Sequence, residues 1–227
     1  MAILHHHPLD PFSRRIRLML GEMALPAELI EERPGPARPE LLALNPSGSV
    51  PVLFEDDGAV LCGAYAITEY IEEAHGAAKS MLGASPAERA ETRRLISWFD
   101  EKFNAEVTQP IVGEKVISRF LPAELGGGAP DMSRVRAGIA NLRAHLHVIA
   151  ALTDARNWLA GPSLTAADLA AAAHLSCIDY LGDVPWHESP GAKAWYQRIK
   201  SRPSFRPLLS DHVRGMSPPG HYADLDF

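Results

Sequence analysis

Three consecutive histidines near the N-terminus, His5-His6-His7, are the first side chains of the chain whose chemistry suits a metal ion. They fall at the end of a predicted strand, where successive side chains face opposite sides of a sheet, so three neighbours cannot converge on one ion. The only thiols, Cys62 and Cys177, form no motif typical of a metal or redox site. We therefore predict no metal site and expect both cysteines to be buried small hydrophobic residues.

A second feature that could bind a ligand lies in the backbone of a loop. Residues 45–53, Asn-Pro-Ser-Gly-Ser-Val-Pro-Val-Leu, form a loop that runs into a short apolar strand. Pro51 has no N–H, so it must lie at the start or the edge of that strand. If the Val50-Pro51 bond is cis, the N–H and C=O of Val50 point away from the sheet, where a peptide-shaped ligand can pair with them as an extra strand.

Composition narrows the class of protein. Of the 227 residues, 46% are hydrophobic and 22% are charged, which is ordinary for a globular protein of one or two domains. The net charge of −6 argues against a nucleic-acid-binding surface and against general attraction to anionic membranes. No signal-peptide pattern and no apolar run of membrane-spanning length is present, so we expect a cytoplasmic protein without direct membrane insertion.

The first 76 residues predict a small sheet with helices around it. Asp10 and Pro11 suit the N-cap and first position of a helix that ends before Pro26. The run Asp56-Asp57-Gly58 is typical of a hairpin turn between two short strands. The expected strands are residues 2–6, 28–32, 52–55 and 59–62, and the further helices are residues 39–44 and 63–75, with a Pro-rich loop at 33–39.

The rest of the chain predicts helices. Thr165 and Asp168 have the spacing of a capping box, and the alanines after them favour close packing at the centre of a helical domain, so we give this pair a structural role. Pro110 and Gly113 are expected to break or kink the helix that contains them. The expected helices are residues 87–112, 132–152, 186–200 and 203–211, with a flexible loop at 121–130.

Three stretches together resemble the thioredoxin-like half of the cytosolic glutathione transferases. They are residues 45–53, Asp57-Gly58-Ala59-Val60-Leu61 and Ala66-Ile67-Thr68-Glu69-Tyr70-Ile71. The resemblance covers about residues 1–211, because the second half repeats the helical pattern of that family. It implies an α/β plus all-α fold: a thioredoxin-like domain at 1–76, a linker at 77–85, an all-helical domain at 86–211 and an extended C-terminal tail at 212–227. Since this scaffold carries both enzymes and non-enzymes, it implies a fold more strongly than a function.

Glutathione transferases stabilise a thiolate with a Tyr or Ser hydroxyl, or use a Cys, at or near the first helix. The resemblance places Asp10 at this position, where a carboxylate repels a thiolate, and Ser13 lies one turn too far along. The Glu or Gln and the Ser that hold the γ-glutamyl carboxylate in the family are replaced by Gly63 and Ala64, which offer no side-chain hydrogen bond. The predicted vestigial glutathione site comprises Asp10, Ser13, Val50, Pro51, Gly63 and Ala64, with no catalytic residue, no cofactor and no glutathione binding.

The last residues form a separate feature. Pro218-Pro219-Gly220 cannot continue a helix, so we expect the seven residues after it to leave the globule, although a strand tucked back on the body is the alternative. Aromatic and aliphatic residues alternate with acids there, a pattern that favours anchoring in a partner's groove with steering towards basic groups. The predicted partner-binding residues are His221, Tyr222, Asp224, Leu225, Asp226 and Phe227.

This ending, together with the degraded pocket, resembles a non-catalytic branch of the family: the glutathione-transferase-like division proteins of α-proteobacteria. The resemblance implies a homodimer that binds filaments of the tubulin-like protein FtsZ at the division site and alters their curvature. The alternative is an enzyme, namely a glutathione-dependent transferase, isomerase or thiol reductase that uses Ser13, with His6 or His7 as a conceivable base. General stress or chaperone binding is a minor third alternative.

Overall fold

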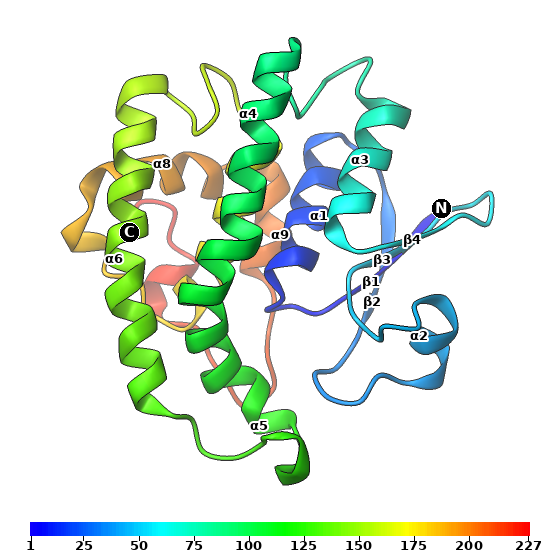
Figure 1. Cartoon of the computed structure of the whole chain (residues 1–227), viewed down its shortest axis with the longest axis vertical. Coiled ribbons are helices and arrows are strands. Elements are labelled where there is room, and N and C mark those ends of the chain that lie inside the picture. Colours follow the sequence, from blue (N-terminus) through cyan, green and yellow to red (C-terminus); the bar gives the residue numbers. More distant parts are fainter.

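The computed structural model describes residues 1–227 and shows two parts joined along one helix (Figure 1). A four-stranded sheet with its helices lies on one side and a helical body on the other, with α1 (Pro11–Glu22) between them. The sheet has the order β2-β1-β3-β4, in which β1 and β2 are parallel and the other neighbours are antiparallel. Its strands are β1 (Ala2–His6), β2 (Ala27–Glu31), β3 (Val52–Phe54) and β4 (Val60–Cys62), with α2 (Pro39–Leu44) before β3 and α3 (Ala64–His75) after β4.

These elements form where their local sequence indicates. The Asp10 carboxylate accepts a hydrogen bond of 2.6 Å from the Ser13 N–H, which caps α1 as predicted. Leu4 of β1 lies opposite Leu53 of β3, and both side chains are fully buried. The predicted element order and the predicted fold class are therefore confirmed, with strand ends that differ by at most one residue.

Helix α7 (Ala166–Tyr180) is the centre of the helical body, and every one of its residues is buried. The predicted capping box at its start is present: Asp168 accepts hydrogen bonds from the Thr165 N–H and hydroxyl. Helix α1 packs along α7 and so joins the sheet to the helical body. The other helical elements are α4 (Pro86–Ser97), η1 (Trp98–Ile117), α5 (Ser118–Phe120), η2 (Ala123–Leu125), α6 (Met132–Arg156), η3 (Trp186–Glu188), α8 (Pro190–Lys200), η4 (Pro203–Phe205), α9 (Arg206–Leu209) and η5 (Gly220–Tyr222).

The sequence predicts a break or a kink of the helix at Pro110 and Gly113, and a break is wrong, because helical structure continues from α4 through η1 to Phe120. Element η1 has wider π-type turns, in which an N–H bonds to the carbonyl five residues back, as the Ser118 N–H does to Gly113. Helices α6 and α7 both pack along η1, whose apolar side chains are buried. This packing outweighs the roughly 3 kcal/mol that a proline costs inside a helix.

One predicted cysteine environment is also wrong. Cys177 is buried in α7 as expected, whereas Cys62 is exposed. Along the edge strand β4, Val60 and Cys62 are exposed while Leu61 between them is half-buried, as expected when successive side chains face opposite sides of a sheet. No group of three or more His, Cys, Asp or Glu side chains is placed to hold a metal ion. None of the helices combines the length and the apolar character that crossing a bilayer requires.

Candidate functional site

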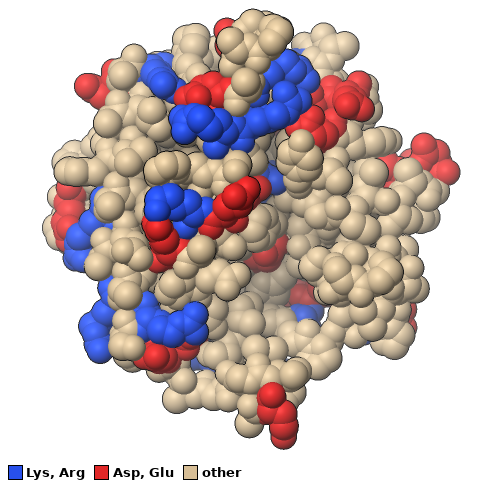
Figure 2. Space-filling view, in the orientation of Figure 1, with Lys and Arg blue, Asp and Glu red and all other residues tan.

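A cleft of about 770 Å³ lies where the sheet meets the helical body. Figure 2 shows the hollow between the two parts, with acidic atoms visible inside it. The cleft is built by the turn after β1, the first turn of α1, the loop between β2 and α2, and the loop before β3, with Ile117 of η1 closing the far side. A second cavity of about 440 Å³ shares Asp10, Phe12 and Ile117 with it and extends along η1.

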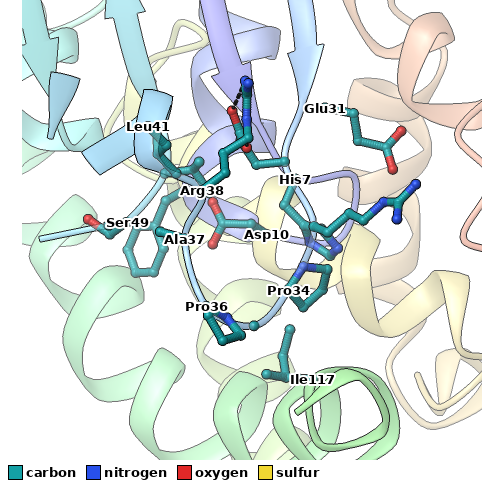
Figure 3. Close-up of a pocket in the computed structure, with 16 residues that line it drawn as sticks. His7, Asp10, Glu31, Pro34, Pro36, Ala37, Arg38, Leu41, Ser49 and Ile117 are labelled. Atoms are coloured by element: carbon teal, nitrogen blue, oxygen red, sulfur yellow. Dashed lines mark hydrogen bonds and ion pairs between the residues drawn. The ribbon is translucent and has the colours of Figure 1, made fainter. Parts of the chain in front are cut away.

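Asp10 lies among the side chains that line this cleft, in Figure 3 between His7, Arg38 and Pro36. Burial raises the pKa of its carboxyl group to about 6. At neutral pH the group is therefore largely ionised although it is poorly solvated. A second anion beside it, such as a thiolate, is unfavourable, because two negative charges at close range oppose each other's ionisation.

Ser13, the nearest hydroxyl on α1, does not line the cleft. Its side chain is fully buried, and its Oγ lies 3.3 Å from the His7 N–H, from which it accepts a hydrogen bond. The hydroxyl thus closes the turn between β1 and α1. In this arrangement it has no access to a ligand in the cleft.

One group of polar side chains beside the loop between β2 and α2 is paired through Glu32. Arg38 donates two hydrogen bonds to Glu32, at 2.8 and 2.7 Å, and His5 Nδ1 lies 2.7 Å from the same carboxylate. These contacts, the bonds from Arg38 above all, hold the pKa of Glu32 below its usual range. On the opposite wall, burial lowers the pKa of His7 to about 4, so its imidazole is neutral at pH 7.

The Val50-Pro51 peptide bond is cis. Val50 lines the cleft, and neither its N–H nor its C=O takes part in a strand or in any other backbone hydrogen bond. Pro51 instead accepts from the Gly63 N–H at 2.9 Å. Gly63 caps α3 with a φ of 85° and Ala64 follows it, and the start of this helix has no side-chain hydrogen bond.

Of the six residues predicted for the vestigial site, the structure brings Asp10 and Val50 into the cleft. Ser13, Pro51, Gly63 and Ala64 lie outside its lining. Sequence reasoning missed Arg33 and Arg38, which it treated only as part of a loop. The available signal was the pair of basic residues within a Pro-rich run at the end of a strand.

The predicted departure of the C-terminal end from the globule is wrong, because residues 220–227, the C-terminal segment, fold back on the helical body. Tyr222 is fully buried. Its hydroxyl accepts from Arg14 Nη1 at 3.0 Å and donates to the Leu208 carbonyl at 3.0 Å. The tucked-back alternative is closer to the structure, although the segment forms a short helical turn rather than a strand.

The remaining residues of the C-terminal segment divide between inward and outward faces. The Phe227 ring packs against Trp186 of η3, with ring centroids 5.4 Å apart, and His221 Nε2 lies 3.1 Å from the buried Asp179 carboxylate. Asp224 and Asp226 are exposed. Tyr222 is therefore unavailable as an anchor for a partner while the segment is docked, whereas the two acids face solvent.

Comparisons with known proteins agree with this architecture. Residues 11–74 match the family model described as glutathione S-transferase, N-terminal domain, and residues 109–203 match the one described as glutathione S-transferase, C-terminal domain. The chain is 50% identical over 227 residues to FtsZ-localized protein A of Caulobacter vibrioides, covering 99% of this chain and 97% of that protein.

Two solved structures are similar along the whole chain. One is a glutathione S-transferase from Rhodospirillum rubrum, with a TM-score of 0.94 and 50% identity, covering 100% of both chains. The other is FzlA from C. crescentus, with a TM-score of 0.93 and 48% identity, covering 100% of this chain and 99% of that one. In each case the similarity includes the C-terminal segment.

Proposed function

The chain belongs to the glutathione S-transferase family, and within it we propose a non-catalytic protein that binds FtsZ filaments as a homodimer and modulates their curvature during cell division. The observation that carries the proposal is the 50% identity to FtsZ-localized protein A over 97% of that protein, which extends through the C-terminal segment. By this proposal the protein works in the cytoplasm at the division site. Its partner-binding residues are the exposed members of the C-terminal segment, Asp224 and Asp226 first.

The chemistry of the cleft supports a non-catalytic role. A thiolate-stabilising hydroxyl or a nucleophilic thiol is missing from the first turn of α1, where Asp10 faces the cleft and Ser13 faces His7. The start of α3 offers only backbone groups to a carboxylate, since Gly63 and Ala64 have no polar side chain. We propose that glutathione does not bind here at cellular concentrations.

The face formed by α3 and α4 supports the homodimer. Tyr65 on α3 is 63% exposed. Beside it lies a cavity of about 530 Å³ lined by residues of α1, α3, α4 and η1, including Arg15 and Asp100. A two-fold contact across this face buries both copies of Tyr65, and the dimer then carries two C-terminal segments that can engage neighbouring filament subunits.

Co-sedimentation with FtsZ polymer tests the proposal. Removal of Asp224–Phe227 is expected to abolish pelleting while the circular dichroism spectrum and the dimeric state stay unchanged. The charge reversal Asp226→Lys is expected to weaken pelleting, and the difference from the parent protein shrinks as salt rises. The matched control is Glu124→Lys, which reverses an exposed charge in η2 away from the C-terminal segment. Equal pelleting of the truncated and intact proteins contradicts the assignment of the segment.

An enzyme is the second candidate function, and the size of the cleft is the observation that favours it, since about 770 Å³ suffices for a tripeptide. The expected signs are retention on immobilised glutathione and turnover of an aryl halide. We expect neither. A glutathione complex with its sulfur beside Ser13 overturns the non-catalytic proposal.

A further inference from the structure

Two buried contacts hold the C-terminal segment against the helical body. The first is made by Arg14 of α1, whose side chain is fully buried. Its guanidinium donates to the Tyr222 hydroxyl, to Ser176 Oγ of α7 at 2.8 Å and to the Asp211 carboxylate at 3.3 Å. The Tyr222 ring packs edge-on against Tyr180, with centroids 5.2 Å apart. One ring and its hydroxyl thus join the segment to both α1 and α7.

The second contact centres on Lys200 of α8, whose side chain is also fully buried. Its Nζ donates to the His221 carbonyl at 3.0 Å and lies 3.9 Å from the centroid of the Phe227 ring. The same nitrogen lies 3.8 Å from the Asp179 carboxylate, which also meets His221 Nε2. A buried ammonium group therefore has a backbone carbonyl and an aromatic face of the segment among its few partners.

Undocking of the C-terminal segment costs free energy in the helical body as well as in the segment. Undocking removes the Tyr222 hydroxyl from Arg14 and the His221 carbonyl from Lys200, so two buried cations each lose a partner. It also brings the rings of Tyr222 and Phe227 into water. The docked form is therefore the form that a partner meets.

In the docked form only some side chains of the segment are exposed to solvent. Ala223, Asp224 and Asp226 are exposed, and Leu225 is half-buried between them. The Asp226 N–H donates to the Asp224 carboxylate at 2.9 Å, and the Asp224 N–H donates to the His221 carbonyl at 3.1 Å, so the backbone between the two acids is fixed. The outward face is a short acidic edge of defined geometry.

Resting on the function proposed above, we propose that the polymer partner recognises this acidic edge in place, on a basic surface of its own, and that Arg14 and Lys200 are positioning residues for it. The partner then binds the two carboxylates without having to order the chain that carries them. The segment is already ordered on the helical body, so its conformational entropy is not lost again on binding. Binding is therefore tighter than that of a free peptide with the same residues. Neither Tyr222 nor Phe227 inserts into the partner.

The experiment compares two variants that loosen the segment with one that does not. Tyr222→Phe removes the hydroxyl and keeps the ring, and Lys200→Met removes the ammonium group and keeps the stem. Arg198→Met is the matched control, because Arg198 also lies on α8 but contacts Asn157 and the Trp158 ring instead of the segment. Each full-length protein is measured by hydrogen exchange at the amides of residues 222–226 and by pelleting with FtsZ polymer.

We expect the intact protein and Arg198→Met to protect the Tyr222 and Asp224 amides and to bind equally. In Tyr222→Phe and Lys200→Met we expect exchange about tenfold faster at these amides and binding about five- to tenfold weaker, with both acids still present. Tighter or unchanged binding by the loosened variants overturns the proposal, since the segment then acts after release. Free-chain exchange at residues 222–226 in the intact protein overturns it independently of any partner.

A synthetic peptide of residues 217–227 separates this proposal from the proposed function. We expect the peptide to bind the polymer at least about tenfold more weakly than one docked segment on the folded protein does, and therefore to compete poorly with the protein. Competition as strong as the protein's own binding overturns the positioning role while the function stands. If removal of Asp224–Phe227 leaves pelleting unchanged, the assignment of the segment fails, and this proposal fails with it.

Discussion

The cleft and the docking site of the C-terminal segment share α1 but differ in how their buried polar groups are matched. At the start of α1, Asp10 faces the cleft, and its pKa is raised to about 6 by burial. One turn later, Arg14 is fully buried and has hydrogen-bond acceptors from the chain on several sides. The two charged groups of the same helix therefore differ in how well the fold compensates their burial.

The largest loss of stability is expected from substitution of Arg14. Arg14→Met removes the buried donor to the Pro8 carbonyl, Ser176 Oγ and the Tyr222 hydroxyl, although Asp211 keeps two hydrogen bonds from Arg17. The substitution is expected to lower the free energy of unfolding by about 3–5 kcal/mol. Urea denaturation measures the loss. Arg33→Met, which removes an exposed guanidinium on the cleft wall, is the matched control and is expected to change stability by less than about 0.5 kcal/mol. Equal effects of the two substitutions remove the contrast between the two regions.

A smaller effect is expected at Asp10, and it depends on pH. Because the folded-state pKa lies above the unfolded value, the folded protein binds more protons between about pH 4 and pH 6, and this carboxyl group lowers stability as pH rises through that window. Asp10→Asn keeps an N-cap side chain and removes the charge. The variant is expected to match the parent at pH 4 and to be more stable by about 1–3 kcal/mol at pH 7. Thermal unfolding across this range measures it, and parallel pH profiles contradict it.

Gain of ligand binding tests the cleft side of the comparison directly. The variant Asp10→Ser removes the repelling carboxylate and places a hydroxyl in the lining of the cleft. One hydrogen bond to a charged group is worth about 1.5–3 kcal/mol, so glutathione affinity is expected to rise about tenfold or more. Isothermal titration calorimetry measures the change. No gain in this variant contradicts the assignment of Asp10 as the group that opposes a thiolate.

The smallest effect is expected on the outer wall of the cleft. The Arg38 side chain is 41% exposed, so its ion pair with Glu32 is partly screened by solvent. Arg38→Met is expected to lower the free energy of unfolding by the smallest amount of these substitutions, and by less at high salt. Chemical denaturation at low and high salt gives both values. A loss as large as that of Arg14→Met shows that the cleft wall is as strongly coupled to the fold as the docking site.

Local sequence signals were sufficient for most of the fold. Asp10 and Pro11 mark the start of α1, and Thr165 with Asp168 marks the start of α7, because the residues that cap a helix lie within one turn of its first N–H groups. The same reasoning failed at Pro110. There the deciding factor was the packing of α6 and α7 along η1, which a local pattern does not contain.

The candidate site was less predictable, for the same reason. Tyr222 reads as an exposed anchor in an acidic tail, and only its contact with Arg14, 208 residues earlier in the chain, makes it a buried residue. The charges that hold the segment gave a weak signal of their own: Asp179 near the end of a helix rich in alanine, and Lys200 at the end of an amphipathic one. Such charges need a partner, but the sequence does not say which one.

The contact between Arg14 and Tyr222 also bears on the order in which the protein can be completed during translation. The first helix emerges from the ribosome early, whereas the hydroxyl that its guanidinium contacts is 208 residues further along the chain. Until residue 222 has emerged, the nascent chain lacks this acceptor for one of its most deeply enclosed charges. This contact of the first helix therefore forms only late in translation.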